Sequence, residues 1–251
     1  GDPERSWCVE PMMHKPVPWQ PNSSISEDGH RFACKHEEAM PIRIVVAIDC
    51  SGSMSSGPRP NREPFASWSN NRLGCALAAF DDFMTRRAKD SPSDVVTIIG
   101  FDDKIVCCED VAVQDILSRR RILGSLKSRG GTCFALAITK MQQVLQESLL
   151  GKNAKVLVLF LSDGQCSFPD AEMRGLLRVC HSNSWDLRFH ALQFPFASVH
   201  RSLQQMVTVV KSSPSKFAQA SSACACQGDI QLQDTLHGVV MSLGGNLGGV
   251  L

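Results

Sequence analysis

The chain lacks several features that identify common classes of protein. No stretch reaches the roughly 18 to 20 consecutive apolar residues that a membrane-spanning helix requires. No apolar signal sequence stands at its N-terminus. The formal net charge is only +1, which argues against a protein that neutralises nucleic-acid phosphates. We therefore expect an ordinary globular protein with no membrane span and no nucleic-acid partner.

Motifs of two large enzyme classes are also missing. Neither Gly-x-x-x-x-Gly-Lys-Ser/Thr nor Gly-x-Gly-x-x-Gly occurs, so nucleotide binding has no support. No Gly-x-Ser-x-Gly elbow surrounds the serine at position 51, as a hydrolase nucleophile of that type would require. We expect a binding module rather than an enzyme, and a metal-dependent hydrolase is the catalytic alternative.

Cysteine is plentiful, but its pattern is not that of a disulfide framework. The 11 cysteines are odd in number and scattered along the chain. Cys50, Cys75, Cys107 and Cys180 lie within or beside apolar patterns, where a free thiol behaves as a small hydrophobe. Disulfide-rich secreted domains are usually short and have an even number of cysteines. We expect a cytoplasmic protein, with an extracellular location as the alternative.

Composition divides the chain into three parts. Residues 1–40 are rich in proline, which indicates an irregular, extended N-terminal segment. Residues 41–243 alternate between strand and helix patterns, which is typical of βαβ units around a parallel sheet. The Gly-rich tail, 244–251, is expected to fray. The middle part is therefore the predicted domain.

The patterns within this domain predict a doubly wound α/β fold. Strands are expected near 42–49, 94–101, 104–107, 155–162, 187–194 and 216–219. Helices are expected near 71–89, 115–126, 133–150, 169–182, 199–210 and 229–243. A tight Asp-Asp turn precedes the strand at 104–107, so this strand is predicted to be an antiparallel edge. The other strands are predicted to form a mostly parallel sheet with helices on both faces.

Short oxygen-bearing side chains follow two of the predicted strands. Asp49, Ser51 and Ser53 come after the first strand, and Asp163 follows the most apolar one. Thr132 stands after a Gly pair, just before a helical pattern. The carboxyl ends of parallel strands meet at one edge of a sheet, so these side chains should lie together. Hydroxyl and carboxylate oxygens suit Mg²⁺, with Mn²⁺ or Ca²⁺ as alternatives.

These segments resemble the metal-ion-dependent adhesion site of a von Willebrand factor type A domain. The pattern of that site is Asp-x-Ser-x-Ser, then Thr, then Asp, and the resemblance covers about 41–243. It implies that Ser51, Ser53 and Thr132 bind the ion directly, whereas Asp49 and Asp163 act mainly through waters. An Asp or Glu of a partner protein would take the remaining coordination position. The resemblance thus implies metal-dependent protein–protein interaction, either by an intracellular scaffold or adaptor or by an extracellular adhesion domain.

Each of these residues also has an ordinary structural explanation. An aspartate at a strand end can cap a following helix or turn, and Thr132 can be the N-cap of the helix after it. The serines can be turn formers. The presence of all five residues in the family order is what favours a metal site over these alternatives.

The loop after Ser53 is longer than in short members of this family. Arg59, Arg62 and Arg72 add positive charge there. Phe65 and Trp68 add apolar area, and Arg and Trp are over-represented among interface hot spots. We expect Arg59, Arg62, Phe65 and Trp68 to help select the partner. A surface insertion without a binding role is the alternative.

Overall fold

The computed structural model describes residues 42–57, 71–148, 150–164, 166–195 and 198–244, and three short strands nearer the N-terminus. The chain divides into two units, 1–40 and 41–251. In the first unit, β1 (Trp7–Cys8), β2 (Ser23–Ile25) and β3 (Arg31–Ala33) form an antiparallel sheet in the order β1-β3-β2. The sequence patterns did not indicate these strands, because elements this short show no detectable alternation.

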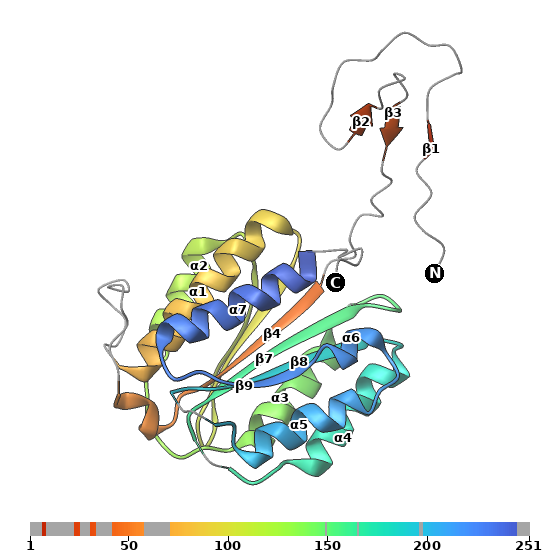
Figure 1. The fold of residues 1–251 in the computed structure, drawn as a ribbon. Helices are drawn as coiled ribbons and strands as arrows, with labels where there is room; N and C mark the ends of the chain where they lie inside the picture. The colour runs from red at the N-terminus through yellow and green to blue at the C-terminus, as the bar shows by residue number, and fades with distance from the viewer. Residues whose placement is uncertain are drawn as a thin grey trace. The chain divides into compact units, whose positions relative to one another are not determined.

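A six-stranded sheet in the order β6-β5-β4-β7-β8-β9 forms the centre of the second unit (Figure 1). Its strands are β4 (Ile42–Asp49), β5 (Val95–Phe101), β6 (Ile105–Ala112), β7 (Lys155–Ser162), β8 (Asp186–Gln193) and β9 (Ser222–Ala225). The edge strand β6 pairs antiparallel with β5, and all the other neighbours are parallel. This arrangement confirms the predicted mostly parallel sheet with one antiparallel edge strand.

Helices cover both faces of this sheet (Figure 1). One face is covered by α1 (Arg72–Asp90), α2 (Ile116–Ser125) and α7 (Asp229–Gly244). The other is covered by α3 (Phe134–Glu147), α4 (Asp170–Ser182), α5 (Arg201–Lys211) and the short α6 (Lys216–Gln219). A 3₁₀ turn, η1 (Gly52–Ser55), follows β4. Within the described residues, none of the helices has both the length and the apolar character needed to cross a bilayer.

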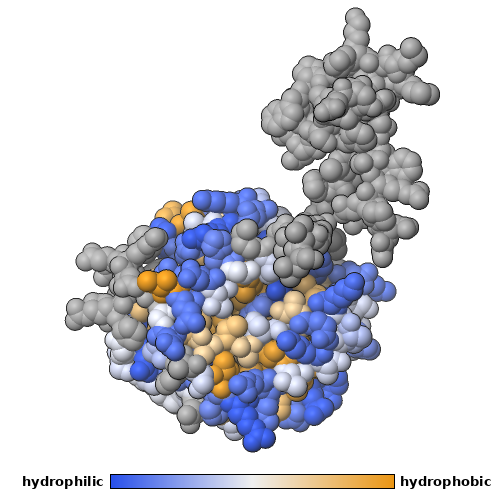
Figure 2. All heavy atoms as spheres, viewed as in Figure 1, coloured by the Kyte–Doolittle hydropathy of each residue, from blue (hydrophilic) through white to orange (hydrophobic). Residues whose placement is uncertain are grey.

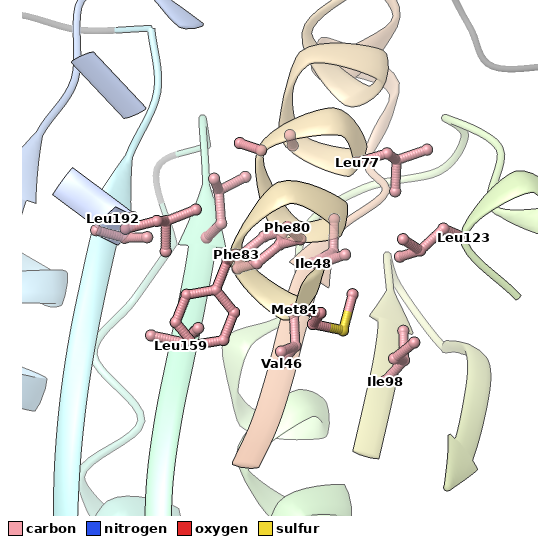
Figure 3. Close-up of a cluster of buried hydrophobic side chains, with 14 of the residues drawn as sticks. Val46, Ile48, Leu77, Phe80, Phe83, Met84, Ile98, Leu123, Leu159 and Leu192 are labelled. Atoms are coloured by element: carbon pink, nitrogen blue, oxygen red, sulfur yellow. The ribbon is translucent and has the colours of Figure 1, made fainter. Parts of the chain in front are cut away.

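Helix α1 packs across the middle of the sheet through an apolar stripe (Figure 3). Leu77, Phe80 and Met84 recur at helical spacing and are buried against strands that include Val46 and Ile48 of β4. Because helices cover both of its faces, all eight residues of β4 are buried. The end of β4 is therefore held rigidly by the core, together with the side chains that follow it.

Edge strand β9 is less completely covered than the central strands. All four of its residues are only partly buried. In Figure 2, hydrophobic residues gather in the middle of the visible face, where Figure 1 places β9 between α7 and α5. Hydrophilic residues dominate the surrounding helices (Figure 2). The partial burial of β9 follows from its position at the edge of the sheet, where it has a strand neighbour on one side only.

Two predicted strands differ from the structure. The strand expected at 216–219 is wrong, because these residues form α6 and the edge strand follows at β9. The side chain of Ser215 accepts hydrogen bonds from two backbone N–H groups of the next turn, and these bonds start a helix in place of the predicted strand. Strand β6 extends well beyond the predicted 104–107.

Candidate metal centre

The carboxyl end of the sheet carries the predicted oxygen ligands. Strand β4 ends at Asp49, and its parallel neighbour β7 ends at Ser162, directly before Asp163. The chain passes from β4 to β5 on one side and later returns to β7 on the other, so the strand order reverses here. Open α/β sheets bind ligands in the crevice at such a switch point.

Hydrogen bonds connect four of the predicted residues. Asp49 Oδ1 accepts the backbone N–H of Ser51 at 2.8 Å, and Asp49 Oδ2 accepts the hydroxyl of Ser162. The hydroxyls of Ser51 and Ser53 lie 3.0 Å apart. The Ser53 hydroxyl is also 2.7 Å from Asp163 Oδ1, to which it donates. The two strand ends and the turn after β4 thus form one polar network.

Thr132 reaches the same network from a different loop. A Cβ atom added to Gly164 would lie 2.9 Å from Thr132 Oγ1 and 3.5 Å from Asp49 Oδ2. The threonine hydroxyl and the aspartate carboxylate therefore converge on the Gly164 backbone, where a side chain would displace one of them. The structure brings together Asp49, Ser51, Ser53, Thr132 and Asp163, called the oxygen cluster below.

The loop that carries Thr132 is held by the ends of β4 and β5. The backbone N–H of Gly52 donates to the carbonyl of Gly130 at 3.0 Å, and that of Cys133 donates to the carbonyl of Asp102 at 3.0 Å. Gly130 has φ +64°, a conformation that favours glycine. Asp102 belongs to the predicted Asp-Asp turn, and its position directly after β5 is the sequence signal that it lies at this edge of the sheet.

Charge is concentrated at the buried base of the cluster. Asp49 is fully buried, Asp163 is 4% exposed, and Ser53 is exposed to solvent. Burial raises the pKa of the Asp49 carboxyl from 3.8 to about 6; the hydrogen bonds from Ser162 and Ser51 oppose the rise, and the nearby Asp163 charge adds to it. Two carboxylates held this close favour a positive charge between or beside them.

A guanidinium group already lies beside the cluster. Arg72 Nη1 donates to Asp163 Oδ2 at 2.6 Å and to the backbone carbonyl of Ser53 at 3.3 Å. The Asp163 side chain is fully buried, whereas that of Arg72 is 22% exposed. The sequence indicated positive charge near the site, but it did not indicate this ion pair.

The donor atoms of the cluster fit a hard divalent cation. Adjacent ligands of an octahedral Mg²⁺ at about 2.1 Å lie about 3.0 Å from each other, and the Ser51 and Ser53 hydroxyls are 3.0 Å apart. All five side chains offer oxygen, which hard cations prefer. Among the described residues, no group of three or more His, Cys, Asp or Glu side chains could hold a metal ion. The direct ligands at this site would therefore include hydroxyls.

The predicted partner-binding residues lie outside the described residues: Arg59, Arg62, Phe65 and Trp68. These four residues belong to the segment 58–70. The described residues before and after this segment contact each other. The backbone N–H of Arg72 donates to the carbonyl of Ser56 at 3.1 Å. The described residues on either side of this segment therefore meet beside the oxygen cluster.

The fold and the site define an α/β domain whose candidate ligand site lies at the switch point of its sheet. Residues 44–165 match the sequence model of the von Willebrand factor type A domain family. A comparison with curated protein sequences gives no significant match.

Solved structures show the same fold. The PilB minor pilin from Streptococcus sanguinis superposes with a TM-score of 0.60 at 10% identity, over 88% of this chain and 66% of the pilin, just under two thirds of its length. The vWF domain of the type V pili tip protein Mfa5 from Porphyromonas gingivalis gives 0.53 at 10% identity, over 85% and 99%. The SpRpn10 VWA domain gives 0.52 at 13% identity, over 84% and 99%. Residues 42–244 thus adopt the von Willebrand factor type A fold.

Proposed function

We propose that this domain is a protein-interaction module that binds an acidic residue of a partner through a divalent cation. Mg²⁺ is the proposed ion, with Mn²⁺ or Ca²⁺ as alternatives. Ser51, Ser53 and Thr132 would hold it directly, whereas Asp49 and Asp163 would orient these hydroxyls and balance the charge. The observation that carries the proposal is the convergence of the oxygen cluster at the switch point of the sheet.

The hydrogen bonds of the cluster support this division of roles. Asp163 accepts a hydrogen bond from the Ser53 hydroxyl, so the hydrogen of that group points away and a lone pair of its oxygen is left for a cation. Asp49 is engaged by the N–H of Ser51 and the hydroxyl of Ser162. A bound cation would supply positive charge for a partner carboxylate. Hydroxyl ligands leave that charge less neutralised than carboxylate ligands would.

We propose a binding role without catalysis. A serine nucleophile needs an adjacent general base. In the described part of the chain, neither Ser51 nor Ser53 has its hydroxyl hydrogen bonded to a histidine; the two contact each other and Asp163. A phosphatase assay with Mg²⁺ tests this point, because turnover that disappears in Ser53→Ala would favour the metal-dependent hydrolase.

The proposed setting is the cytoplasm, where the domain would act as a scaffold or adaptor. All nine cysteines whose side chains are described are free, which suits a reducing compartment. An extracellular adhesion domain is the second candidate, because PilB and Mfa5 are pilus proteins with the same fold. Thiol labelling of the protein from its native cells separates the two, since disulfides would favour the extracellular setting.

Calorimetric titration with Mg²⁺ and Mn²⁺ tests the metal site. We expect binding by the wild type and none by the Ser53→Ala, Thr132→Ala double variant. Ser55→Ala is a matched control, because Ser55 lies in the same 3₁₀ turn, is exposed, and donates its hydroxyl to the Gly52 carbonyl at 2.7 Å instead. The titration is repeated with acetate, which supplies a carboxylate. A folded wild type that binds neither ion in either buffer would contradict the proposal.

Affinity capture tests the partner. The immobilised domain is exposed to an extract in Mg²⁺ and then washed with EDTA. We expect a protein that elutes with EDTA and is not retained by the Ser53→Ala, Thr132→Ala variant. Mutation of one Asp or Glu in that protein should abolish retention. A partner that stays bound in EDTA would contradict metal-mediated recognition.

A further inference from the structure

The arginine that begins α1 lies where the dipole of its helix disfavours a positive charge. Arg72 is the first helical residue, and the side chain of the N-cap, Asn71, accepts the N–H of Gly74 at 3.1 Å. A helix N-terminus carries partial positive charge, so a basic side chain there is unfavourable. The same helix has Arg87 and Lys89 in its last turn, where basic residues are favourable. Helix stability therefore does not explain an arginine at position 72.

The contacts of Arg72 explain its position better. Its Nη1 atom lies 2.6 Å from Asp163 Oδ2, across 91 residues of sequence. The other oxygen of this carboxylate accepts the Ser53 hydroxyl at 2.7 Å. One buried carboxylate is therefore shared between a guanidinium and a hydroxyl of the proposed metal site.

The turn after η1 leaves room for this side chain. Gly57 has φ +95°, and a Cβ atom on it would lie 2.5 Å from Nε and 2.7 Å from Cγ of Arg72. The backbone of Arg72 donates to the Ser56 carbonyl at 3.1 Å. A glycine in a left-handed conformation thus lets the guanidinium reach Asp163.

The charges of the site show what the guanidinium does. Asp49, Asp163 and Arg72 together carry one net negative charge when both carboxyls are ionised. A bound divalent cation would change this to one net positive charge, whereas without the arginine the loaded site would be neutral. The guanidinium offsets the repulsion between the two carboxylates, and it would repel a cation bound beside them.

We propose that Arg72 is a tethered cation that competes with the divalent ion for Asp163. It therefore weakens metal binding when no partner carboxylate is present. This inference rests on the proposed function. The partner carboxylate neutralises the positive charge of the loaded site, so metal and partner strengthen each other's binding. Arg72 therefore biases the site toward holding its cation only when an acidic partner is present.

Calorimetry with Mg²⁺ on the full chain tests this role. We expect Arg72→Gln to bind Mg²⁺ about tenfold more tightly than the wild type, because repulsion worth about 1.4 kcal/mol is lost. Arg72→Lys keeps the charge and should stay close to the wild type. Arg86→Gln is the matched control: it removes the same charge from an exposed pair with Asp82, about 21 Å along the helix.

Two further measurements secure the interpretation. In EDTA, Arg72→Gln should have a lower melting temperature than the wild type. Addition of Mg²⁺ should raise the melting temperature by more degrees in the variant than in the wild type. Gly57→Ala should push the guanidinium away and tighten Mg²⁺ binding without removing the charge, which gives a second test if Arg72→Gln does not fold.

The outcomes separate this inference from the proposed function. Equal Mg²⁺ affinity in the wild type, Arg72→Gln and Gly57→Ala would overturn the tethered cation and leave the metal site in place. Binding only by the variants would support both ideas, because the arginine then excludes the ion. Absence of Mg²⁺ and Mn²⁺ binding in every folded protein would overturn the metal site itself.

Discussion

Helix α1 places one arginine against a buried aspartate at each end of the sheet, and the two pairs have different surroundings. At the amino end, Arg87 Nε lies 2.6 Å from Asp94 Oδ2, and Asp94 Oδ1 accepts the N–H of Ile42 at 3.0 Å. Their side chains are 3% and 1% exposed. At the carboxyl end, Arg72 and Asp163 are also 2.6 Å apart, but the arginine is 22% exposed.

The two pairs differ in how far their surroundings exclude solvent. Both oxygens of Asp94 have protein donors in a closed environment, so the amino-end pair stabilises the fold. Asp163 has donors too, but they are the exposed Ser53 and the partly exposed Arg72. Under the proposal that Arg72 competes with a divalent cation, only the carboxyl-end pair would exchange its counter-charge.

The largest effect should follow from breaking the closed pair. Arg87→Met leaves Asp94 buried without its counter-charge, so we expect the free energy of unfolding to fall by about 3 to 5 kcal/mol. Arg86→Met, at the neighbouring exposed position, should change it by less than about 0.5 kcal/mol. Urea unfolding measures both. Similar losses in the two variants would show that the amino-end pair has no special structural role.

A smaller effect should come from a buried group that belongs to neither pair. His190 on β8 contacts the Ser222 hydroxyl at 2.6 Å. Burial, together with smaller effects of the charges of Arg188 and Lys211, lowers the pKa of His190 from 6.5 to about 3. Below pH 6.5 the imidazole of His190 is protonated in the unfolded chain but stays neutral in the native state. The contribution of neutral His190 to the free energy of unfolding is therefore present above this pH and is lost as the pH falls toward 3. The loss is about 1.4 kcal/mol per pH unit.

Urea unfolding between pH 7 and pH 4.5 measures this loss. We expect the wild type to lose about 2 to 3 kcal/mol more than His190→Gln, which cannot titrate in this range. Mg²⁺ affinity at pH 7 should be the same in both proteins, because His190 lies away from the oxygen cluster. Parallel stability curves would mean that the histidine is not held neutral by burial.

The smallest effect on stability is expected from a change at Gly164, beside the oxygen cluster. The same change should have a clear effect on metal binding. Gly164→Ala places a Cβ 2.9 Å from Thr132 Oγ1, so the threonine must move. We expect Mg²⁺ binding to weaken about tenfold, or about 1.4 kcal/mol, and the free energy of unfolding to fall by no more than about 1 kcal/mol. Gly131→Ala is the control in the Thr132 loop, because nothing lies within 4 Å of its added Cβ. Equal calorimetric titrations would contradict a role for Thr132 in binding.

Much of the fold could be predicted from periodicity alone. The predicted ranges 42–49 and 155–162 coincide with β4 and β7, because buried parallel strands are apolar on both faces and end sharply at polar residues. The strand predicted at 216–219 is wrong because only Phe217 and Ala218 of these four residues are apolar, and so short a segment shows no periodicity that separates a helical turn from a strand. Capping by Ser215 decided between them.

The sequence by itself determined which oxygen-bearing residues follow the strand ends and in what order, because polar side chains directly after apolar runs mark those ends. Only the tertiary structure decided that Arg72 meets Asp163, that Ser162 donates to Asp49, and that Thr132 leaves no room for a side chain at position 164. These contacts join residues that are distant along the chain. Periodicity specifies which face of an element is buried, but the register of β4 against β7 and the packing of α1 set which side chains meet.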